Sequence, residues 1–245
     1  MGITQGMTEF LPISSTAHLN LLSRQLRQKP DLAVDTALHL GSLGATLLWV
    51  WRCRQSLPLK DPQFWGKWAL ATLPAGLAGL CFEKQIKRWR RPALTAGLLS
   101  GGGLALLWIS HRTRHQTPLP LKELSYGQSL GIGFAQALAL LPGLSRSGMT
   151  QMAGQWYGLS GTEAQRFSFL MALPIVSASA AFEMRDLRQE TINRLLPGLV
   201  TAGLSSHLML KHVSYFSVGV PYQTLGVYRV LLGAYLLKNA ASSPS

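Results

Sequence analysis

At residues 142–150 the chain reads Pro-Gly-Leu-Ser-Arg-Ser-Gly-Met-Thr, a polar bend that follows a mainly apolar run. Gly143 permits backbone conformations that other residues avoid, so neighbouring amide N–H groups can converge on one point. Ser145 and Ser147 add hydroxyl groups, and Arg146 adds a planar fork that matches phosphate oxygens. A charge at a bilayer centre costs roughly 2.5–3.5 kcal/mol on insertion scales, so this bend predicts a functional anion site in an apolar chain.

A second polar bend lies near the start of the chain, where residues 5–18 read Gln-Gly-Met-Thr-Glu-Phe-Leu-Pro-Ile-Ser-Ser-Thr-Ala-His. Ser15 is a candidate nucleophile. His18 follows three residues later, one helical turn away, and an imidazole within reach can take the proton of an attacking hydroxyl. One hydroxyl of Ser14, Ser15 and Thr16 is also expected to cap the following helix. We predict that the two bends form the two halves of one phosphate-binding site.

The carboxylate of the first bend has two candidate roles. Glu9 can hold a divalent cation or a proton, and Gln5 lies four residues earlier on the same helical face. Magnesium commonly uses one or two carboxylates together with substrate phosphates rather than a cage made only of protein ligands. We therefore predict Glu9 and Gln5 as the protein ligands of a metal site.

The two bends resemble each other in sequence. Each combines a glutamine, an apolar stretch, a proline and a hydroxyl cluster, with Gln5, Pro12 and Ser14 in the first and Gln136, Pro142 and Ser145 in the second. Repeats of this kind bring broken helices together in membrane proteins, where irregular backbone lines a cavity. We predict two re-entrant helix hairpins, at about 1–25 and 128–158, related by an inverted repeat. The first arm is expected to be short, since residues 1–8 span only about 12 Å of helix.

Composition favours a membrane protein. The 245 residues are 47% hydrophobic and 13% charged, and this charged fraction is about half of the ~25% usual in soluble domains. The apolar residues form blocks close to the length of a membrane-spanning helix. The fold prediction is a single all-α, polytopic integral membrane domain, 1–245. A soluble protein with buried helices is the alternative. The blocks are 33–51, 68–82, 92–110, 167–182, 195–210 and 225–237.

The net charge of +13 arises from 23 Lys and Arg residues against 10 Asp and Glu residues. The cations lie between the apolar blocks, with the densest run at 83–91, which favours contact with anionic lipid over nucleic-acid binding. Basic loops on alternate sides leave the orientation open. The two cysteines, Cys53 and Cys81, have neither metal-ligand spacing nor a disulfide pattern.

Several polar residues inside apolar blocks are weaker candidates. His39, Gln136 and the pair Tyr228-Arg229 can line the cavity, although Arg229 can equally extend from its helix to lipid headgroups. The small residues Gly97 and Gly101 have the spacing that lets helices approach closely, which indicates packing rather than chemistry.

At these motifs the chain resembles the bacterial undecaprenyl pyrophosphate phosphatases associated with bacitracin resistance. Both long motifs occur in the family's order, and softer matches lie at 38–42, at 166–170 and at Tyr228-Arg229, so the likeness covers nearly the whole chain. Gln5 stands where some members have a second glutamate. The resemblance implies a multi-pass enzyme of the bacterial plasma (inner) membrane, with two re-entrant hairpins and a site on the extracytoplasmic side.

The implied reaction removes the terminal phosphate of undecaprenyl pyrophosphate with a divalent cation, magnesium or calcium. By motif position the catalytic residues would be Glu9, Ser15, His18 and Arg146, and the substrate-binding residues Ser14, Thr16, Gly143, Ser145 and Ser147. Our hypothesis is that Arg146 and the metal neutralise the diphosphate, Ser15 attacks the terminal phosphorus and His18 takes the proton; a water nucleophile is the alternative.

The expected partners are a polyprenyl pyrophosphate and membrane lipids, without nucleic acid, and a homodimer is left open. A lipid-phosphate transporter or flippase is the rival reading, because broken helices in inverted repeats are also typical of transporters. A third possibility is an inactive relative that only binds the substrate. A nucleophile beside a base distinguishes the enzyme from both.

Overall fold

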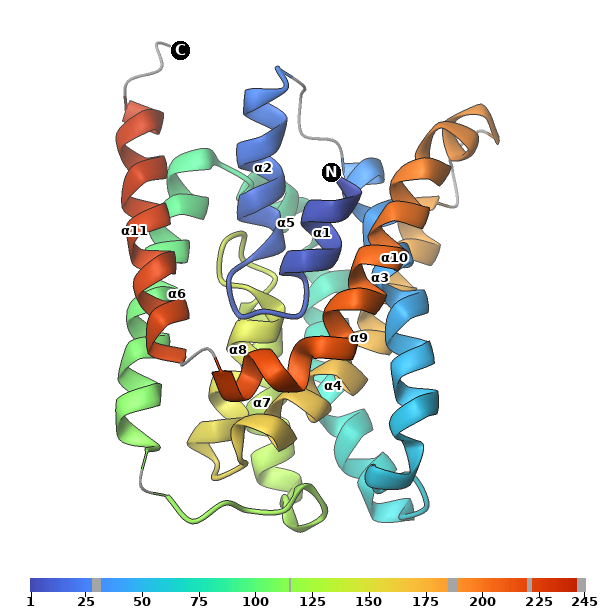
Figure 1. Ribbon diagram of the computed structural model, residues 1–245, viewed down its shortest axis with the longest axis vertical. Helices are drawn as coiled ribbons and strands as arrows, with labels where there is room; N and C mark the ends of the chain where they lie inside the picture. Colours follow the sequence, from blue (N-terminus) through green and yellow to red (C-terminus); the bar gives the residue numbers. More distant parts are fainter. Residues whose placement is uncertain (28–31, 115, 185–188, 220–221, 242–245) are drawn as a thin grey trace.

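The structure, a computed structural model, describes residues 1–27, 32–114, 116–184, 189–219 and 222–241. Over these ranges the regular structure is helical, which confirms the all-α prediction (Figure 1). The helices are α1 (Gly2–Thr8), α2 (Ser15–Gln25), α3 (Leu32–Cys53), α4 (Pro62–Cys81), α5 (Glu83–Arg88), α6 (Pro92–Arg112), α7 (Tyr126–Leu138), α8 (Arg146–Trp156), α9 (Gly161–Met184), α10 (Gln189–Gly219) and α11 (Tyr222–Ala241). Short 3-10 turns occur at Arg54–Ser56 and Leu121–Glu123.

Local sequence signals explain where several helices begin. Asp61 caps α4 by accepting a hydrogen bond from the Gln63 backbone N–H at 2.9 Å. Ser125 and Gln128 form a reciprocal capping box at the start of α7. Pro92 occupies the first position of α6, where a missing N–H costs nothing.

Both polar bends form helix–turn–helix units, α1–α2 and α7–α8. Ser14 and Ser145 precede the second helix of each unit, and both adopt φ 69°, a region that residues other than glycine seldom occupy. The first unit comprises Gly2–Thr8 and Ser15–Gln25, and the second comprises Tyr126–Leu138 and Arg146–Trp156. The Ser125 capping box sets the start of the second unit.

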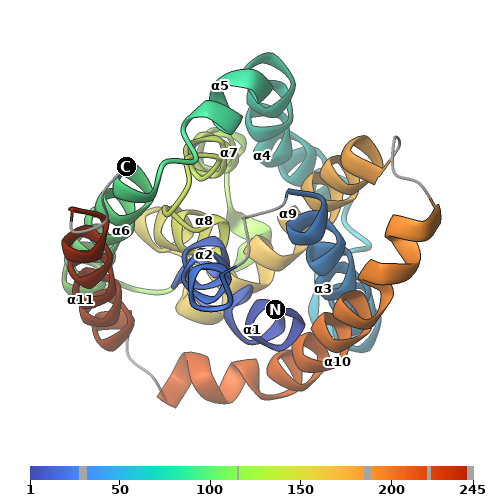
Figure 2. The ribbon, with the colours of Figure 1, turned by 90° about the horizontal axis from the view of Figure 1, so that it is seen from above.

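The remaining helices surround these two units. Three pairs of helices pack along each other: α6 with α11, α3 with α10, and α4 with α7. Viewed from above in Figure 2, α1, α2 and α8 lie near the centre, and the outer helices form a ring around them. The bends are therefore held in the interior by long helices on their flanks.

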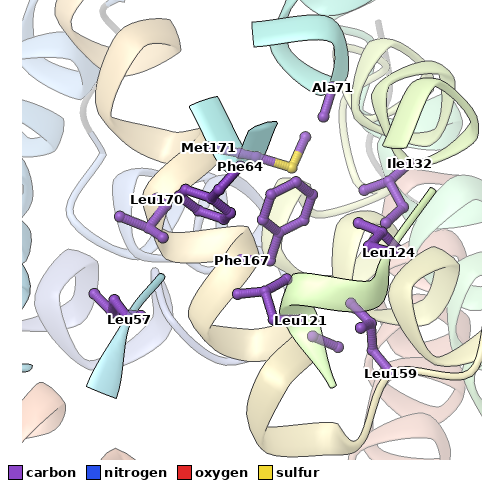
Figure 3. Close-up of a cluster of buried hydrophobic side chains, with 11 residues drawn as sticks. Leu57, Phe64, Ala71, Leu121, Leu124, Ile132, Leu159, Phe167, Leu170 and Met171 are labelled. Atoms are coloured by element: carbon purple, nitrogen blue, oxygen red, sulfur yellow. The ribbon is translucent and has the colours of Figure 1, made fainter. Parts of the chain in front are cut away.

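A cluster of buried apolar side chains fixes the second unit in place (Figure 3). Phe64 of α4 and Phe167 of α9 meet edge to face, with ring centroids 6.2 Å apart. Ile132 of α7 and Met171 of α9 are fully buried in the same cluster. Burial of side chains of this size stabilises by about 1.5–3 kcal/mol each, so α7 is tied firmly to α4 and α9.

The outer helices expose many large apolar side chains. Leu73 on α4, Leu104 on α6, Leu204 on α10 and Leu231 on α11 are each more than half exposed. A soluble monomer rarely exposes so much apolar surface on several elements, so contact with lipid is the simplest account. In the part of the chain that the structure describes, α6 is the one helix long and apolar enough to cross a membrane, with a mean hydropathy of 1.5.

Glycines allow two close helix contacts. A Cβ at Gly6 of α1 would collide with the backbone of α10 at Ser206, and one at Gly103 of α6 would collide with Gly226 of α11. The expectation of close packing at Gly97 and Gly101 is wrong, since a Cβ at either position would meet nothing within 4 Å. The α6–α11 contact uses the other face of α6.

Candidate active site

The two polar bends meet directly. Glu9 of the first and Arg146 of the second form an ion pair, with Oε1 and Nη2 2.5 Å apart. The Ser147 hydroxyl donates to the Leu11 carbonyl at 2.8 Å, which joins the two bends a second time. The prediction that the acidic and the basic bend share one site in space is confirmed, whereas the catalytic roles of their residues stay predictions.

Arg229 of α11 connects the two bends through hydrogen bonds. Its guanidinium donates to the carbonyls of Pro12 at 2.9 Å, Gly143 at 3.2 Å and Leu144 at 2.9 Å. The side chain is completely buried, so the alternative that Arg229 extends to lipid headgroups is wrong. The two turns leave these carbonyls without helical donors, and the Arg229 guanidinium supplies the missing hydrogen bonds.

The Glu9 carboxylate is the centre of a hydrogen-bond network. Its Oε2 accepts from the Ser15 hydroxyl and from the Gln5 amide, each at 2.9 Å. His39 Nε2 lies 3.4 Å from the same oxygen. Glu9 is 7% exposed, and a buried carboxylate needs such partners to stay ionised.

Two helix N-termini also point at the site. Ser15 is the first residue of α2 and Arg146 is the first residue of α8. Ser145 caps α8 by accepting from the Gly148 N–H at 3.1 Å. The first N–H groups of a helix lack partners within it and carry its positive dipole end, so both termini favour an anion between them.

A cavity of about 430 Å³ opens beside these groups. Its polar end contains most of the predicted site, and its walls continue over apolar residues such as Leu80, Leu140 and Val176. Such a cavity suits a ligand with a charged head and an apolar tail. The predicted residues that line it are Glu9, Ser14, Ser15, Thr16, Gly143, Ser145, Arg146 and Ser147.

His18 does not form the predicted pair with Ser15. Its Nδ1 lies 2.8 Å from the Ser14 carbonyl, and its Nε2 lies 2.6 Å from the Tyr228 hydroxyl. A carbonyl only accepts, so Nδ1 carries the proton and a neutral ring accepts from Tyr228. Within the described residues the Ser15 hydroxyl donates to Glu9 instead. Glu9, and not His18, is therefore the hydrogen-bond partner of the Ser15 hydroxyl.

A double-mutant cycle tests this pairing. We expect the double variant His18→Ala/Tyr228→Phe to lose no more turnover than the single variant His18→Ala, because each substitution removes the same hydrogen bond. Additive losses would show that His18 acts independently of Tyr228. Tyr235→Phe on the same helix is the matched control and should leave turnover unchanged, since Tyr235 is exposed.

The structure adds residues to the cavity lining and leaves several candidates outside it, namely Gln5, His18, Gln136, Tyr228 and Arg229. Asp35, His39 and Arg90 line the cavity, and Arg90 pairs with Asp35 at 3.1 Å. The sequence had indicated His39 weakly and had placed Arg90 in a lipid-facing basic run. Gln136 is buried outside the cavity lining.

The described residues contain no group of three or more His, Cys, Asp or Glu side chains that could hold a metal ion. Glu9 supplies one carboxylate, and Gln5 Oε1 is a buried oxygen without a hydrogen-bond partner in the described chain. Glu9 lines the cavity and fits a magnesium ion that takes its other ligands from substrate phosphates and water, whereas Gln5 lies outside the cavity lining and its amide nitrogen faces Glu9.

Comparison with known proteins identifies the class. The family model described as bacitracin resistance protein BacA matches residues 1–235, and the chain belongs to this family. The chain is similar to the undecaprenyl-diphosphatase of Moorella thermoacetica, with 35% identity over 97% of this chain and 94% of the relative. It is also similar to undecaprenyl-diphosphatase 2 of Stutzerimonas stutzeri, with 38% identity over 97% and 95% of the two chains. These matches confirm the family resemblance.

Proposed function

We propose that this protein removes the terminal phosphate of undecaprenyl pyrophosphate and so regenerates the monophosphate carrier of cell-wall precursors. The observation that carries the proposal is the buried hydroxyl–carboxylate pair of Ser15 and Glu9 beside the Arg146 guanidinium in one cavity. A transporter needs an anion site but has no use for a hydroxyl paired with a base. The names of the relatives support the same reaction.

The cavity provides for both parts of this substrate. The diphosphate would lie between the N-termini of α2 and α8, where Arg146, the Ser14 hydroxyl and the first N–H groups of both helices can donate to its oxygens. The first isoprenyl units would follow the apolar wall. Arg146 is bound to Glu9 in the structure, so the incoming phosphate would share the guanidinium with that carboxylate.

The chemistry follows from the hydrogen bond between Ser15 and Glu9. The Ser15 oxygen attacks the terminal phosphorus while its proton passes to Glu9, and the bond from that phosphorus to the bridging oxygen breaks. The lipid monophosphate leaves, and water then cleaves the phosphoserine to release inorganic phosphate. In the alternative, a water molecule attacks directly and Ser15 only binds the phosphate.

A divalent cation, magnesium or calcium, belongs to this proposal as a cofactor held by Glu9 and Gln5. When bound, it supplies positive charge that neutralises the diphosphate. Glu9 and Arg146 largely cancel each other's charge, so the cavity on its own offers little net positive charge to a diphosphate.

The membrane arrangement is also part of the proposal. The hairpins α1–α2 and α7–α8 would enter the bilayer and return, as an inverted repeat within a multi-pass bacterial inner-membrane protein. The equal φ of Ser14 and Ser145 and the exposed apolar outer helices support this arrangement. The orientation with the site on the extracytoplasmic side rests on family analogy.

Phosphate release from the soluble analogue farnesyl pyrophosphate, by the full chain in detergent, tests the function. We expect magnesium- or calcium-dependent release, and Ser15→Ala should lower kcat about 100-fold, within the range for loss of a positioned proton-transfer or nucleophilic group. Ser56→Ala, at an exposed turn, is the matched control. Substantial turnover by Ser15→Ala would favour the water mechanism, and no release by the unaltered protein would reject the proposal.

A further inference from the structure

A second, smaller cavity lies next to the active-site cavity. Its volume is about 80 Å³, and its lining comes from α2, the start of α6 and the end of α11. Asn20 and Arg24 of α2 contribute an amide and a guanidinium. Arg90 lines both cavities, so the two sites are neighbours that share one cation.

The lining of this cavity is positively charged. Among the residues that the structure describes, it contains the two guanidinium groups of Arg24 and Arg90 and no carboxylate. Asp35, which pairs with Arg90 at 3.1 Å, lines the larger cavity instead. Pro92, the first residue of α6, also lines the small cavity, so the positive end of a 21-residue helix dipole lies beside it.

One buried hydroxyl in the lining lacks a partner. Thr95 lines the cavity and is 3% exposed, and its Oγ1 has no hydrogen-bond partner in the described chain. Leaving such a group unsatisfied is unfavourable, so a buried hydroxyl without a partner indicates a ligand or a water. The helix terminus and the unpaired hydroxyl are independent observations that indicate the same site.

The size of the cavity suits a small tetrahedral anion. Its volume of about 80 Å³ exceeds what a single water needs, so it has room for a group larger than water. A phosphate group has five non-hydrogen atoms. Two guanidinium forks, an amide and a hydroxyl are donors that phosphate oxygens accept from in charge-assisted hydrogen bonds.

We infer that this cavity is a second phosphate-binding site, separate from the site of the proposed reaction. Its ligand is a phosphate group, either inorganic phosphate or the terminal phosphate of a lipid headgroup. Arg24, Arg90, Asn20 and Thr95 bind it. The inference stands apart from the proposed hydrolysis, because it requires a bound anion and no chemistry.

Calorimetric titration of inorganic phosphate into the purified full chain in detergent tests the site. Arg24→Gln should weaken binding at least about tenfold, since it removes a charge-assisted hydrogen bond. Thr95→Val should weaken it about threefold to tenfold, and Thr95→Ser should restore it because the hydroxyl returns. Arg112→Gln, at the opposite end of α6, removes the same charge and should bind like the unaltered protein.

A second pair of measurements locates the site and identifies the source of the phosphate. Arg146→Gln alters only the larger cavity and should leave this binding in place. If phosphatidic acid in the micelles displaces inorganic phosphate, the ligand is a lipid headgroup, and if it does not, the ligand is free phosphate. The inference is overturned if the unaltered protein binds no phosphate, if Arg24→Gln and Thr95→Val bind normally, or if Arg146→Gln alone abolishes binding.

Discussion

Replacing Arg146 with alanine should reduce phosphate release from farnesyl pyrophosphate by about 10³–10⁵-fold, the loss seen when a phosphoryl-transfer site is deprived of its arginine. Arg146 is the one predicted catalytic residue that carries a permanent positive charge, and its guanidinium reaches the Glu9 carboxylate beside Ser15. Charge that develops on the transferring phosphoryl group would therefore lose its main protein partner. Initial-rate measurements of kcat and KM on the purified variant check this expectation.

The same replacement leaves Glu9 buried without its cation, and removal of one partner of a buried ion pair costs about 3–5 kcal/mol of stability. The double variant Glu9→Gln/Arg146→Gln separates the two effects, because it removes both charges. We expect it to unfold at a higher temperature than Arg146→Ala and to stay inactive. Arg112→Ala, at an exposed position, is the control. Full activity in Arg146→Ala would remove Arg146 from the site.

The two bends could be predicted from sequence because their residues have few other uses in an apolar chain. Proline and serine–glycine turns break helices, and a carboxylate or guanidinium at such a break is costly unless it is paired. Glu9 and Arg146 fulfil this expectation, since each is the other's partner. Composition and the length of the apolar blocks were likewise sufficient for the all-helical class.

The partner of Ser15 could not be predicted, because spacing along a helix does not fix where a side chain points. His18 follows Ser15 by three residues, yet its ring turns to the Ser14 carbonyl and to Tyr228, which is 210 residues away in sequence. Glu9, six residues before Ser15 and across the turn, accepts the hydrogen bond of the Ser15 hydroxyl instead. Only the path of the bend decides between these two partners.

Arginines were equally ambiguous in sequence. Arg90 lies in a basic run typical of lipid-facing loops, yet it lines the active-site cavity. Arg229 could have reached the headgroups, yet it is fully buried. Arg229 binds carbonyls that two distant turns leave without donors. A contact of this kind cannot be predicted from a single stretch of sequence.

Replacing Arg229 with methionine should lower kcat at least about 100-fold, because a displacement of about 1 Å in a reacting group can cost that much. Arg229 lies outside the lining of the active-site cavity and acts as a positioning residue, since it donates to Pro12 in one bend and to Gly143 and Leu144 in the other. The carbonyls left unsatisfied cost about 1–3 kcal/mol each, so the unfolding temperature should also fall.

A loss of stability alone would not explain the expected kinetics. Leu124→Ala, in the buried cluster of Figure 3, should cost about 2–5 kcal/mol, and since that cluster contains no residue of either bend, it serves as the matched control. Measured well below both unfolding temperatures, Leu124→Ala should keep its kcat, whereas Arg229→Met should lose kcat with a smaller change in KM. Arg229→Lys should recover part of the activity, because its ammonium can still donate to one or two of the carbonyls. Equal kcat values for Arg229→Met and Leu124→Ala would mean that Arg229 supports the fold and does not position the site.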